Sequence, residues 1–500
     1  MSQKNIMSVR STIEFLKEQN EILTVKAEVD PIYEISGITK ALDGGPALLF
    51  ENIKSYPNAR IVSNVFSTRE RVAKIFDVTD HKRMKFKALE AINNPIPAKV
   101  VDSAPCQENI ITEDIDVLNA IPVIKHTEDD AGRILGGGVV LVSGPEIGHD
   151  ITFKRIHFRG KDWASLGFDL GTHLEYHLLR ASQQKGRLPL TINICPSPAV
   201  WLTAGGGGVL LAIPAGTDEL AIAGALQGSP VEIYRAKTVD AYAIASAEWV
   251  IEGYIDTDEL VWESSDAEET GQIGKATFFP EFTGYVGRAW KTYKFQATAI
   301  THRKDKPIFH TPLAHSTEGF YLCQTIREAG VYDACNRIYP GLVIDVNMLD
   351  AFGGNTGIVI QVRKRRRRDE GYQRNMVEAA FAACPFLRLV IVVDEDINIY
   401  NAEDVLFAIN SRMNPIADLM IVSEVRGDPT SPMGRTEGAE RTGISSKMGI
   451  DATVPYGQKW LFTRSRYADA DLSKWLTSEE IAWARAFQSE YARFFAEIRT

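Results

Sequence analysis

The sequence predicts a mixed α/β protein with more than one domain, and three observations support this prediction. The chain has 500 residues, which is more than one hydrophobic core normally organises. Residues 110–310 hold many short apolar runs separated by turn residues, which predicts a β-barrel or β-sandwich with inserted helices. The segments on either side alternate between strand-like and helix-like patterns, as is typical of α/β domains.

The N-terminal α/β segment is expected to end near residue 105. The stretch "SVRSTIEFLKEQN" has the spacing of an amphipathic helix, which Ser11 or Thr12 is predicted to open. The apolar runs "PALLFENI" and "ARIVSNVF" are bounded by proline, asparagine and glycine, and they are predicted strands. The next stretch, "RERVAKIF", returns to helical spacing.

The second half of the chain predicts another α/β domain and a separate tail helix. Within residues 316–475, "GLVIDVNML", "TGIVIQVRK" and "LRLVIVVDED" alternate with helical patterns, which favours mainly parallel strands. Residues 476–500 contain "TSEEIAWARAFQSEYARFF", with Ile481, Trp483, Phe487 and Tyr491 on its apolar face. This helix is too apolar to lie in solvent, so we expect it to pack on its own domain or on another subunit.

Composition excludes several classes of function. The formal net charge of -10 argues against a nucleic-acid partner, since phosphate binding requires a basic surface. The five cysteines form no CxxC pair, which favours a reducing compartment and argues against a structural zinc site. The N-terminus lacks a signal-peptide pattern, and no apolar run reaches the roughly 18–20 residues of a membrane span. We therefore expect a cytoplasmic protein that does not act at a membrane.

Three scattered side chains would suit a hard metal ion if the fold brought them together. These are Asp150, His173 and Glu219, and two carboxylates with one imidazole suit Mn²⁺ or Mg²⁺ better than zinc. Their spacing is not diagnostic, and each alone is more often a surface or capping group. The glycine run Gly205–Gly208 lacks the features of a P-loop or dinucleotide fingerprint, so it indicates a loop or a close backbone approach to a ligand.

A single acid, Glu281, lies among aromatic residues in "KATFFPEFTGYVG". One interpretation is a loop acid that faces solvent. The other is a carboxylic acid whose pKa is raised by apolar surroundings, so that it can deliver a proton near neutral pH. Arg155 alternates with apolar neighbours, and an interior arginine usually has an anionic partner or ligand. His315 is a further polar candidate.

The chain resembles the UbiD family of decarboxylases, which use prenylated FMN. The likeness runs from end to end and is carried by segments in a fixed order: "GPALLFENIKSYPNARIVSNVFSTRERVAKIF", "HTEDDAGRILGGGVVL", "ELAIAGALQGSPVEIYRAKTVD", "FPEFTGY", "VIVVDEDINIYNAEDVLFAINSRMNP" and "SSKMGIDATVP". The "PEFTGY" form and His315 resemble the branch that acts on gallate and protocatechuate more than the ferulic acid branch.

The resemblance implies an architecture and a cofactor site. An N-terminal α/β segment (1–105) would lead into a split β-barrel that binds the flavin (106–315), followed by an α/β domain (316–475) and an oligomerisation helix (476–500). A manganese ion on Asp150, His173 and Glu219 would bridge to the flavin phosphate, with potassium nearby. The family's cofactor-binding positions fall on Thr152, Phe153, Lys154, Arg155, His173 and Glu219.

The resemblance also implies catalytic residues. The family's arginine falls on Arg155, and its proton-donating glutamate falls on Glu281. The first glutamate of the ferulic acid branch lies five residues upstream, where this sequence has Ala276. That departure leaves His315 as a candidate substitute.

The implied activity is reversible, non-oxidative decarboxylation of an aromatic or heteroaromatic acid, with CO₂ as the other small molecule. A prenyl-FMN synthase would supply the cofactor, and the chain would form a homodimer or homohexamer. The alternative is a catalytically idle relative kept as a flavin-binding or assembly subunit. An ordinary FMN oxidoreductase is disfavoured because the sequence has no nicotinamide fingerprint.

Overall fold

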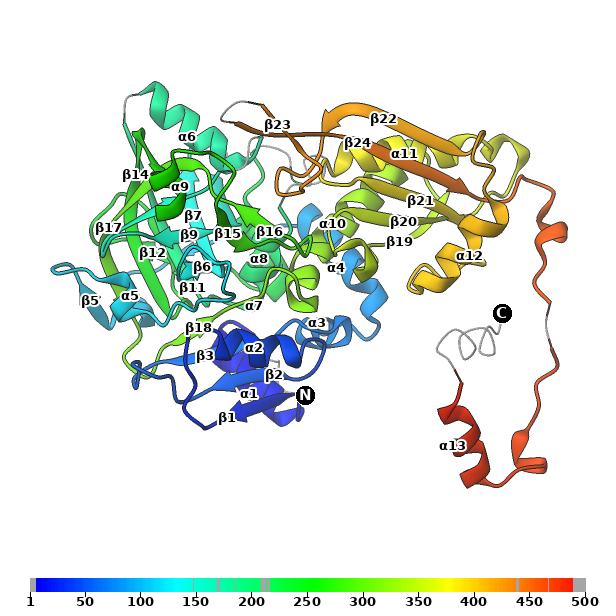
Figure 1. The fold of residues 1–500 in the computed structure, drawn as a ribbon, viewed down its shortest axis with the longest axis horizontal. Coiled ribbons are helices and arrows are strands. Elements are labelled where there is room, and N and C mark those ends of the chain that lie inside the picture. The colour runs from blue at the N-terminus through cyan, green and yellow to red at the C-terminus, as the bar shows by residue number, and fades with distance from the viewer. Residues whose placement is uncertain are drawn as a thin grey trace.

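The computed structural model describes residues 6–146, 148–168, 171–184, 186–207, 213, 216–437, 440–465 and 467–488. In Figure 1 these residues form three bodies: an N-terminal sheet in blue, a large curved sheet in cyan and green, and a C-terminal sheet in yellow and orange. The predicted mixed α/β fold is confirmed. None of the helices found in these residues has the length and apolar character required to span a membrane.

The N-terminal body is a sheet of order β1-β2-β3-β18 with helices around it. Its strand β18 comes from far along the chain and pairs in parallel with β3. The strands are β1 (Ile22–Val25), β2 (Ala47–Phe50), β3 (Arg60–Ser63) and β18 (Ile308–His310), and the helices are α1 (Val9–Glu18), α2 (Glu34–Ala41), α3 (Arg69–Ile75) and α4 (Met84–Asn93).

The start of the first helix differs from the prediction. Ser8, not Ser11 or Thr12, is the N-cap of α1. The Ser8 side chain accepts from the Ser11 backbone N–H at 3.2 Å, and the Ser11 side chain accepts from the Ser8 backbone N–H at 3.3 Å. This reciprocal capping box satisfies two backbone donors that the helix leaves unpaired, which explains why the helix begins one residue after Ser8.

The central body is a curved sheet with strand order β6-β9-β10-β17-β14-β11-β7-β8, and β5 also pairs with β17. Its pairings are antiparallel, as a barrel or sandwich with hairpin connections requires. The strands are β5 (Asn109–Ile111), β6 (Ile134–Leu135), β7 (Gly138–Gly144), β8 (Gly148–Phe153), β9 (Ile156–Phe158), β10 (Trp163–Leu166), β11 (Arg187–Ile194), β14 (Trp249–Trp262) and β17 (Lys291–His302).

Smaller elements complete this body. The hairpin of β15 and β16 follows α9, and a second small sheet has the order β13-β12-β4. The elements are α5 (Val117–Ala120), α6 (His173–Gln183), α7 (Pro198–Gly205), α8 (Glu219–Gln227), α9 (Ser265–Thr270), β4 (Lys99–Val100), β12 (Glu232–Arg235), β13 (Tyr242–Ile244), β15 (Thr277–Pro280) and β16 (Val286–Arg288).

The C-terminal body begins with the long helix α10 (Thr317–Ile338) and contains a sheet of order β19-β20-β21-β24-β22, with β23 on β24. The expectation of mainly parallel strands was wrong: β20, β21 and β24 pair in parallel, whereas β19, β22 and β23 join antiparallel. The other elements are β19 (Val343–Asn347), β20 (Gly357–Val362), α11 (Tyr372–Ala383), β21 (Leu389–Asp394), α12 (Ala402–Arg412), β22 (Leu419–Arg426), β23 (Arg435–Glu437) and β24 (Glu440–Ala452).

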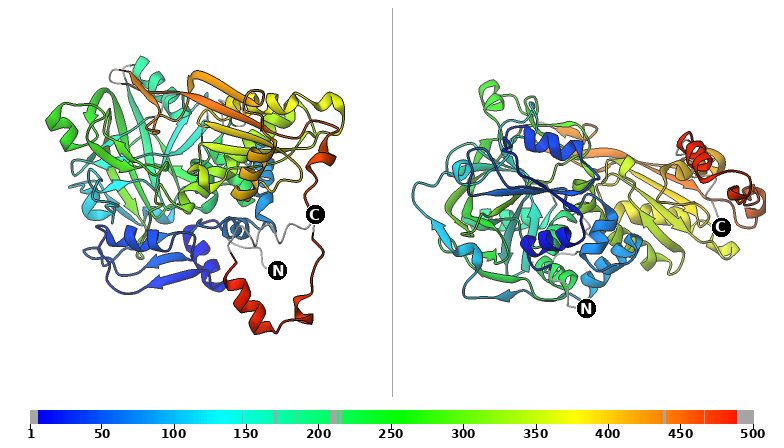
Figure 2. Two further views of the ribbon diagram at one scale, coloured as in Figure 1. Left: turned by 45° about the vertical axis from the view of Figure 1, so that its right-hand side comes forward. Right: turned by 90° about the horizontal axis from the view of Figure 1, so that it is seen from below.

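The tail extends away from all three bodies. Helix α13 (Ser478–Ala486) lies apart from the C-terminal sheet in Figure 1 and in the left view of Figure 2. Its Trp483 is 68% exposed and Phe487 is 73% exposed, while Tyr491 lies outside the described residues. The described part of the tail, which ends at residue 488, therefore does not pack on its own domain, and contact of the tail with another subunit stays a prediction.

Candidate active site

The three predicted metal ligands come together although they are far apart in the sequence. Asp150 lies on β8, while His173 and Glu219 are the first residues of α6 and α8. One ligand atom from each lies within 4.8 Å of the others. Capping side chains fix both helix starts, since Thr172 accepts from the Glu175 backbone N–H and Asp218 from the Ala221 backbone N–H.

The chemistry of this cluster fits a divalent cation. Asp150 and Glu219 are both buried, and the Oδ2 atom of Asp150 has no hydrogen-bond partner among the described residues. Burial and the neighbouring Glu219 raise the pKa of Asp150 well above its usual range, and burial raises the pKa of Glu219 to about 7. The Oε1 atom of Glu219 is 3.4 Å from Nδ1 of His173. Two buried carboxylates beside an imidazole are costly unless a cation neutralises them.

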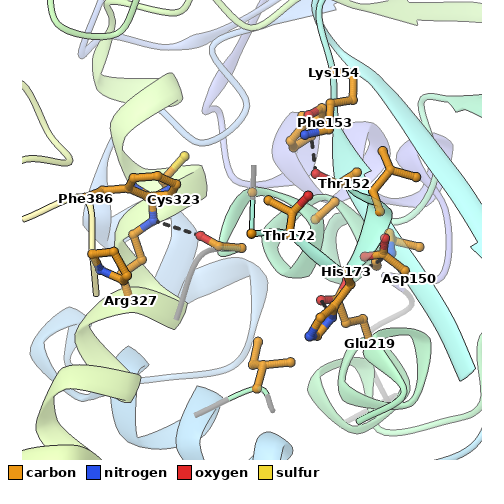
Figure 3. Close-up of a pocket in the computed structure, with 18 of the residues that line it drawn as sticks. Asp150, Thr152, Phe153, Lys154, Thr172, His173, Glu219, Cys323, Arg327 and Phe386 are labelled. Carbon is orange, nitrogen blue, oxygen red and sulfur yellow. Dashed lines mark hydrogen bonds and ion pairs between the residues drawn. The ribbon is translucent and has the colours of Figure 1, made fainter. Parts of the chain in front are cut away.

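A cavity of about 430 Å³ extends from this cluster. Figure 3 shows Asp150, His173 and Glu219 on one side of it, with Arg327 and Phe386 on the other. Every predicted cofactor-binding residue except Arg155 lines this cavity. Its lining includes Thr152, Phe153, Lys154, His173, Glu219, Cys323, Arg327, Pro385, Phe386 and Arg426, so α10 and the C-terminal body form part of the wall.

The far wall of the large cavity is cationic. Arg327 on α10 is buried, and its Nε donates to the carbonyl oxygen of Gly207 at 3.3 Å. The guanidinium carbon lies 5.3 Å from the centroid of the Phe386 ring, and Nη1 has no hydrogen-bond partner in the described part of the chain. With Lys154 and Arg426 also in the lining, the cavity suits an anionic, partly aromatic molecule.

A second cavity, of about 200 Å³, adjoins the first. Phe153, Lys154 and Cys323 line both cavities, so a molecule in the large cavity would face the small one. The walls of the small cavity are mostly apolar, and they carry the ion pair of Arg155 with Glu281. The lining comprises Gly136, Phe153, Lys154, Arg155, Gly167, Phe279, Glu281, Phe282, Pro312, Leu313, Ala314, Gly319, Leu322, Cys323, Asn355 and Thr430.

Glu281 does not face solvent, so its interpretation as a loop acid that faces solvent was wrong. It is 4% exposed, and Nη1 of Arg155 donates to its Oε1. The turn after β15 fixes its backbone, because the Glu281 N–H donates to the carbonyl oxygen of Tyr285 at 2.9 Å. A Cβ atom added at Gly287 would lie 2.5 Å from Oε1 of Glu281, so the glycine leaves room for the carboxylate.

His315 lies beside this turn but does not line either cavity. It is an exposed residue whose Nδ1 donates to the carbonyl oxygen of Phe282 at 2.8 Å. Its ring also packs edge-on against Phe320, with centroids 5.4 Å apart. His315 therefore contacts the residue next to Glu281, and its role in catalysis stays a prediction.

Several residues at the site were missed by sequence reasoning. Glu263, at the end of β14, is buried and accepts from the Trp290 N–H at 2.8 Å. A Cβ atom added at Gly167 would lie 3.3 Å from Oε1 of Glu263 and 3.8 Å from Nη2 of Arg155, so both groups approach the same glycine. Asn355 and Thr430 come from the C-terminal body, and no motif in the sequence connects them with Glu281.

Comparison with known proteins gives matches over nearly the whole chain. Three family models described as 3-octaprenyl-4-hydroxybenzoate carboxy-lyase match: the N-terminal domain at residues 13–87, the Rift-related domain at 99–316 and the C-terminal domain at 320–452. The chain is 32% identical over 474 residues to a gallate decarboxylase of Lactiplantibacillus plantarum, covering 90% of this chain and 94% of the relative.

Solved structures show the same fold. The apo 3,4-dihydroxybenzoic acid decarboxylase from Enterobacter cloacae has a TM-score of 0.82 at 30% identity, covering 95% of this chain and 99% of the other. An evolved dimeric form of the UbiD-class enzyme HmfF from Pelotomaculum thermopropionicum, in complex with prFMN, has a TM-score of 0.80 at 29% identity, with coverage of 95% and 100%.

Proposed function

The chain belongs to the UbiD family of carboxy-lyases, and from this premise we propose that it catalyses the reversible, non-oxidative decarboxylation of an aromatic or heteroaromatic acid with prenylated FMN. The observation that carries the proposal is the buried ion pair of Arg155 and Glu281 in the small cavity, directly beside a larger cavity that ends at the three candidate metal ligands. The pair also argues against an idle flavin-binding subunit, which would not need it.

The large cavity is the proposed cofactor site. Asp150, His173 and Glu219 would hold Mn²⁺, whose charge would neutralise the flavin phosphate in an acidic protein. Thr152, Phe153, Lys154 and Arg155 would line the flavin, with K⁺ bound nearby. When bound, the prenylated flavin supplies the electron sink that amino-acid side chains lack.

Arg155 and Glu281 have different roles in the small cavity. Arg155 binds and orients the carboxylate of the substrate, because a guanidinium matches a carboxylate in both charge and shape. Glu281 delivers a proton to the ring carbon that CO₂ leaves, and its contact with Arg155 orients the carboxyl group. The apolar walls of Phe279, Phe282 and Leu313 keep water away from this transfer.

Three further assignments belong to the proposal. His315 positions the Glu281 turn through the carbonyl group of Phe282. The chain forms a homodimer or homohexamer through its exposed tail, and it works in the cytoplasm beside a prenyl-FMN synthase that supplies the cofactor. The dimeric relative solved with prFMN supports both the cofactor and an oligomer.

The test is co-expression with a prenyl-FMN synthase, followed by a panel of hydroxybenzoates and of indole, pyrrole, furan, phenazine and naphthoate acids. The expected result is a coloured protein that contains manganese and releases CO₂ from at least one acid. Incorporation of labelled CO₂ into the matching product would test reversibility. Flavin-loaded protein that releases no CO₂ from any acid would favour the idle subunit instead.

A further inference from the structure

One buried amide in the small cavity lacks a hydrogen-bond partner. Asn355 lies in the loop before β20, is 1% exposed and lines the cavity that holds Glu281. Its Oδ1 atom is buried with no hydrogen-bond partner among the described residues. Buried amide oxygens are nearly always paired, because an unpaired one costs about 1–3 kcal/mol. The unpaired oxygen and the adjacent empty space together indicate a ligand group.

The loop that carries Asn355 is held firmly in place. The carbonyl oxygen of Gly354 accepts from Nε2 of Gln324 on α10 at 3.0 Å, and the Thr356 hydroxyl donates to the carbonyl oxygen of Phe352 at 2.8 Å. A Cβ atom added at Gly353 would lie 3.7 Å from the carbonyl oxygen of Phe282, so the loop lies against the Glu281 turn. Asn355 is therefore a fixed part of the cavity wall.

The rest of the cavity limits what Asn355 can meet. Most of the wall is apolar, with Phe279, Phe282 and Leu313 among its residues. The Thr430 hydroxyl already donates to Oδ1 of Asp428 at 2.7 Å, so it offers an oxygen acceptor and no free donor. Since no described residue donates to the amide oxygen of Asn355, the group that satisfies it would come from a bound molecule and would donate a hydrogen bond.

We propose that Asn355 recognises a hydroxyl group on the aromatic ring of the substrate. The inference rests on the proposed decarboxylation, in which Arg155 holds the carboxylate of the same molecule. A phenolic O–H donates to Oδ1, and its oxygen can accept from the Asn355 amide N–H. At about 200 Å³ the cavity is smaller than the roughly 300–1,000 Å³ of drug-sized sites, so it fits a single ring.

The proposal makes ring hydroxylation a requirement of the site. An acid without the hydroxyl would enter the cavity but leave the Asn355 oxygen unpaired. Sites built to bind a hydroxyl group discriminate strongly against analogues that lack it, because the polar groups of the site then remain buried without partners. Asn355 belongs to the C-terminal body, whereas Arg155 and Glu281 belong to the central body, so recognition of both ends of the ring needs both bodies in contact.

The experiment measures binding of 3,4-dihydroxybenzoate and benzoate to flavin-loaded protein by isothermal titration calorimetry. Wild-type protein should prefer the dihydroxy acid. Asn355→Leu keeps the size of the side chain but removes both hydrogen-bonding groups, so it should weaken 3,4-dihydroxybenzoate binding by about 10- to 100-fold. The same change should alter benzoate affinity by less than about threefold, since benzoate makes no such bond.

Asn347→Leu is the matched control. Asn347 is also a buried asparagine of the C-terminal body with an unpaired Oδ1, but it does not line the small cavity, and its Nδ2 donates to the carbonyl oxygen of Ile399 at 2.8 Å. Its substitution should lower stability and leave the preference between the two acids unchanged.

Several outcomes overturn the inference: equal wild-type affinity for the two acids, equal losses for both acids in Asn355→Leu, or no loss at all. Asn355→Ala replaces the leucine variant if the latter does not fold. Should neither variant fold, a wild-type preference for the dihydroxy acid supports the inference and its absence overturns it.

The role of Asn355 and the decarboxylation can fail separately. If the protein prefers the dihydroxy acid and loses that preference in the Asn355 variant, but releases no CO₂, only the decarboxylation is refuted. Release of CO₂ without that preference would refute only the role of Asn355.

Discussion

At the scale of single residues, Asp150 and Glu219 are two carboxylates from which water is largely excluded. Glu219→Ala removes an anionic ligand of the proposed metal ion. Without the metal ion nothing neutralises the flavin phosphate, so the variant should lose both metal and flavin and purify folded but colourless. Metal analysis and flavin absorbance would measure this. Glu146→Ala, at an exposed carboxylate outside the cluster, should keep both cofactors. Full manganese and flavin in the Glu219 variant would refute the metal assignment.

Glu281 is the proposed proton donor. Glu281→Gln keeps its size and polarity but cannot transfer a proton, so we expect turnover to fall by about 10²–10⁴-fold while substrate still binds. Deuterium from solvent should enter the product at the carbon that carried CO₂, and the variant should slow that exchange. Glu268→Gln, at a half-exposed carboxylate paired with Arg159, is the control and should behave as wild type. Normal exchange in the Glu281 variant would exclude it as the donor.

The hydrogen bond of His315 to the Glu281 turn can be tested by two substitutions. His315→Ala removes the donor to the Phe282 carbonyl group and should lower turnover by about tenfold, with little change in stability because the residue is exposed. His315→Asn can still donate to that carbonyl group and should recover most of the activity. Equal activity in wild type and the alanine variant would remove His315 from the site.

At the scale of elements, a buried ionic network joins α4 to the C-terminal sheet. Lys85 on α4 is 1% exposed, and its Nζ donates to Oδ1 of Asp345 on β19 and to the Tyr400 hydroxyl, each at 2.6 Å. The Tyr400 hydroxyl also donates to Oδ2 of Asp345 at 2.8 Å. This network connects the N-terminal and C-terminal bodies next to α10, which lines both cavities.

Removing Lys85 should therefore destabilise the contact between these bodies. Lys85→Ala leaves Asp345 without its cation and should cost about 3 kcal/mol, as expected when one partner of a buried pair is lost. Urea unfolding would show this as a lower midpoint. Lys99→Ala, at an exposed pair with Glu232, should change stability by less than about 1 kcal/mol. A Lys85 variant as stable as the Lys99 variant would show that packing alone joins the bodies.

Sequence reasoning succeeded where the resemblance to a family supplied the positions. Among 65 acidic residues and nine histidines, residue type alone could not select a metal site, but the family motif falls on Asp150, His173 and Glu219, and the fold brings these three together. Sequence reasoning failed where contacts link distant segments with ordinary residue types. Asn355 resembles any loop asparagine, and only its position in the fold brings it to Glu281. The start of α1 was missed for a different reason, since several serine and threonine residues offered plausible caps.

At the scale of the whole molecule, the exposed tail predicts assembly. Deleting residues from Ser478 onward removes Trp483 and Phe487, whose rings are exposed in the single chain. If these rings are buried against another subunit, the truncated protein should be a smaller species than the full chain. Light scattering would measure the mass. An unchanged mass would show that the tail contributes nothing to assembly.

The pairing of β18 with β3 has a consequence for the order in which the chain folds during its synthesis. Strand β3 ends at Ser63, but its partner starts only at Ile308. At about 5–20 residues per second, the ribosome leaves this edge of the sheet open for tens of seconds. An unpaired strand edge invites association with other chains, so the nascent protein needs shielding during that interval. Synthesis of the central body ends this exposure, because β18 immediately follows the last strand of the large sheet.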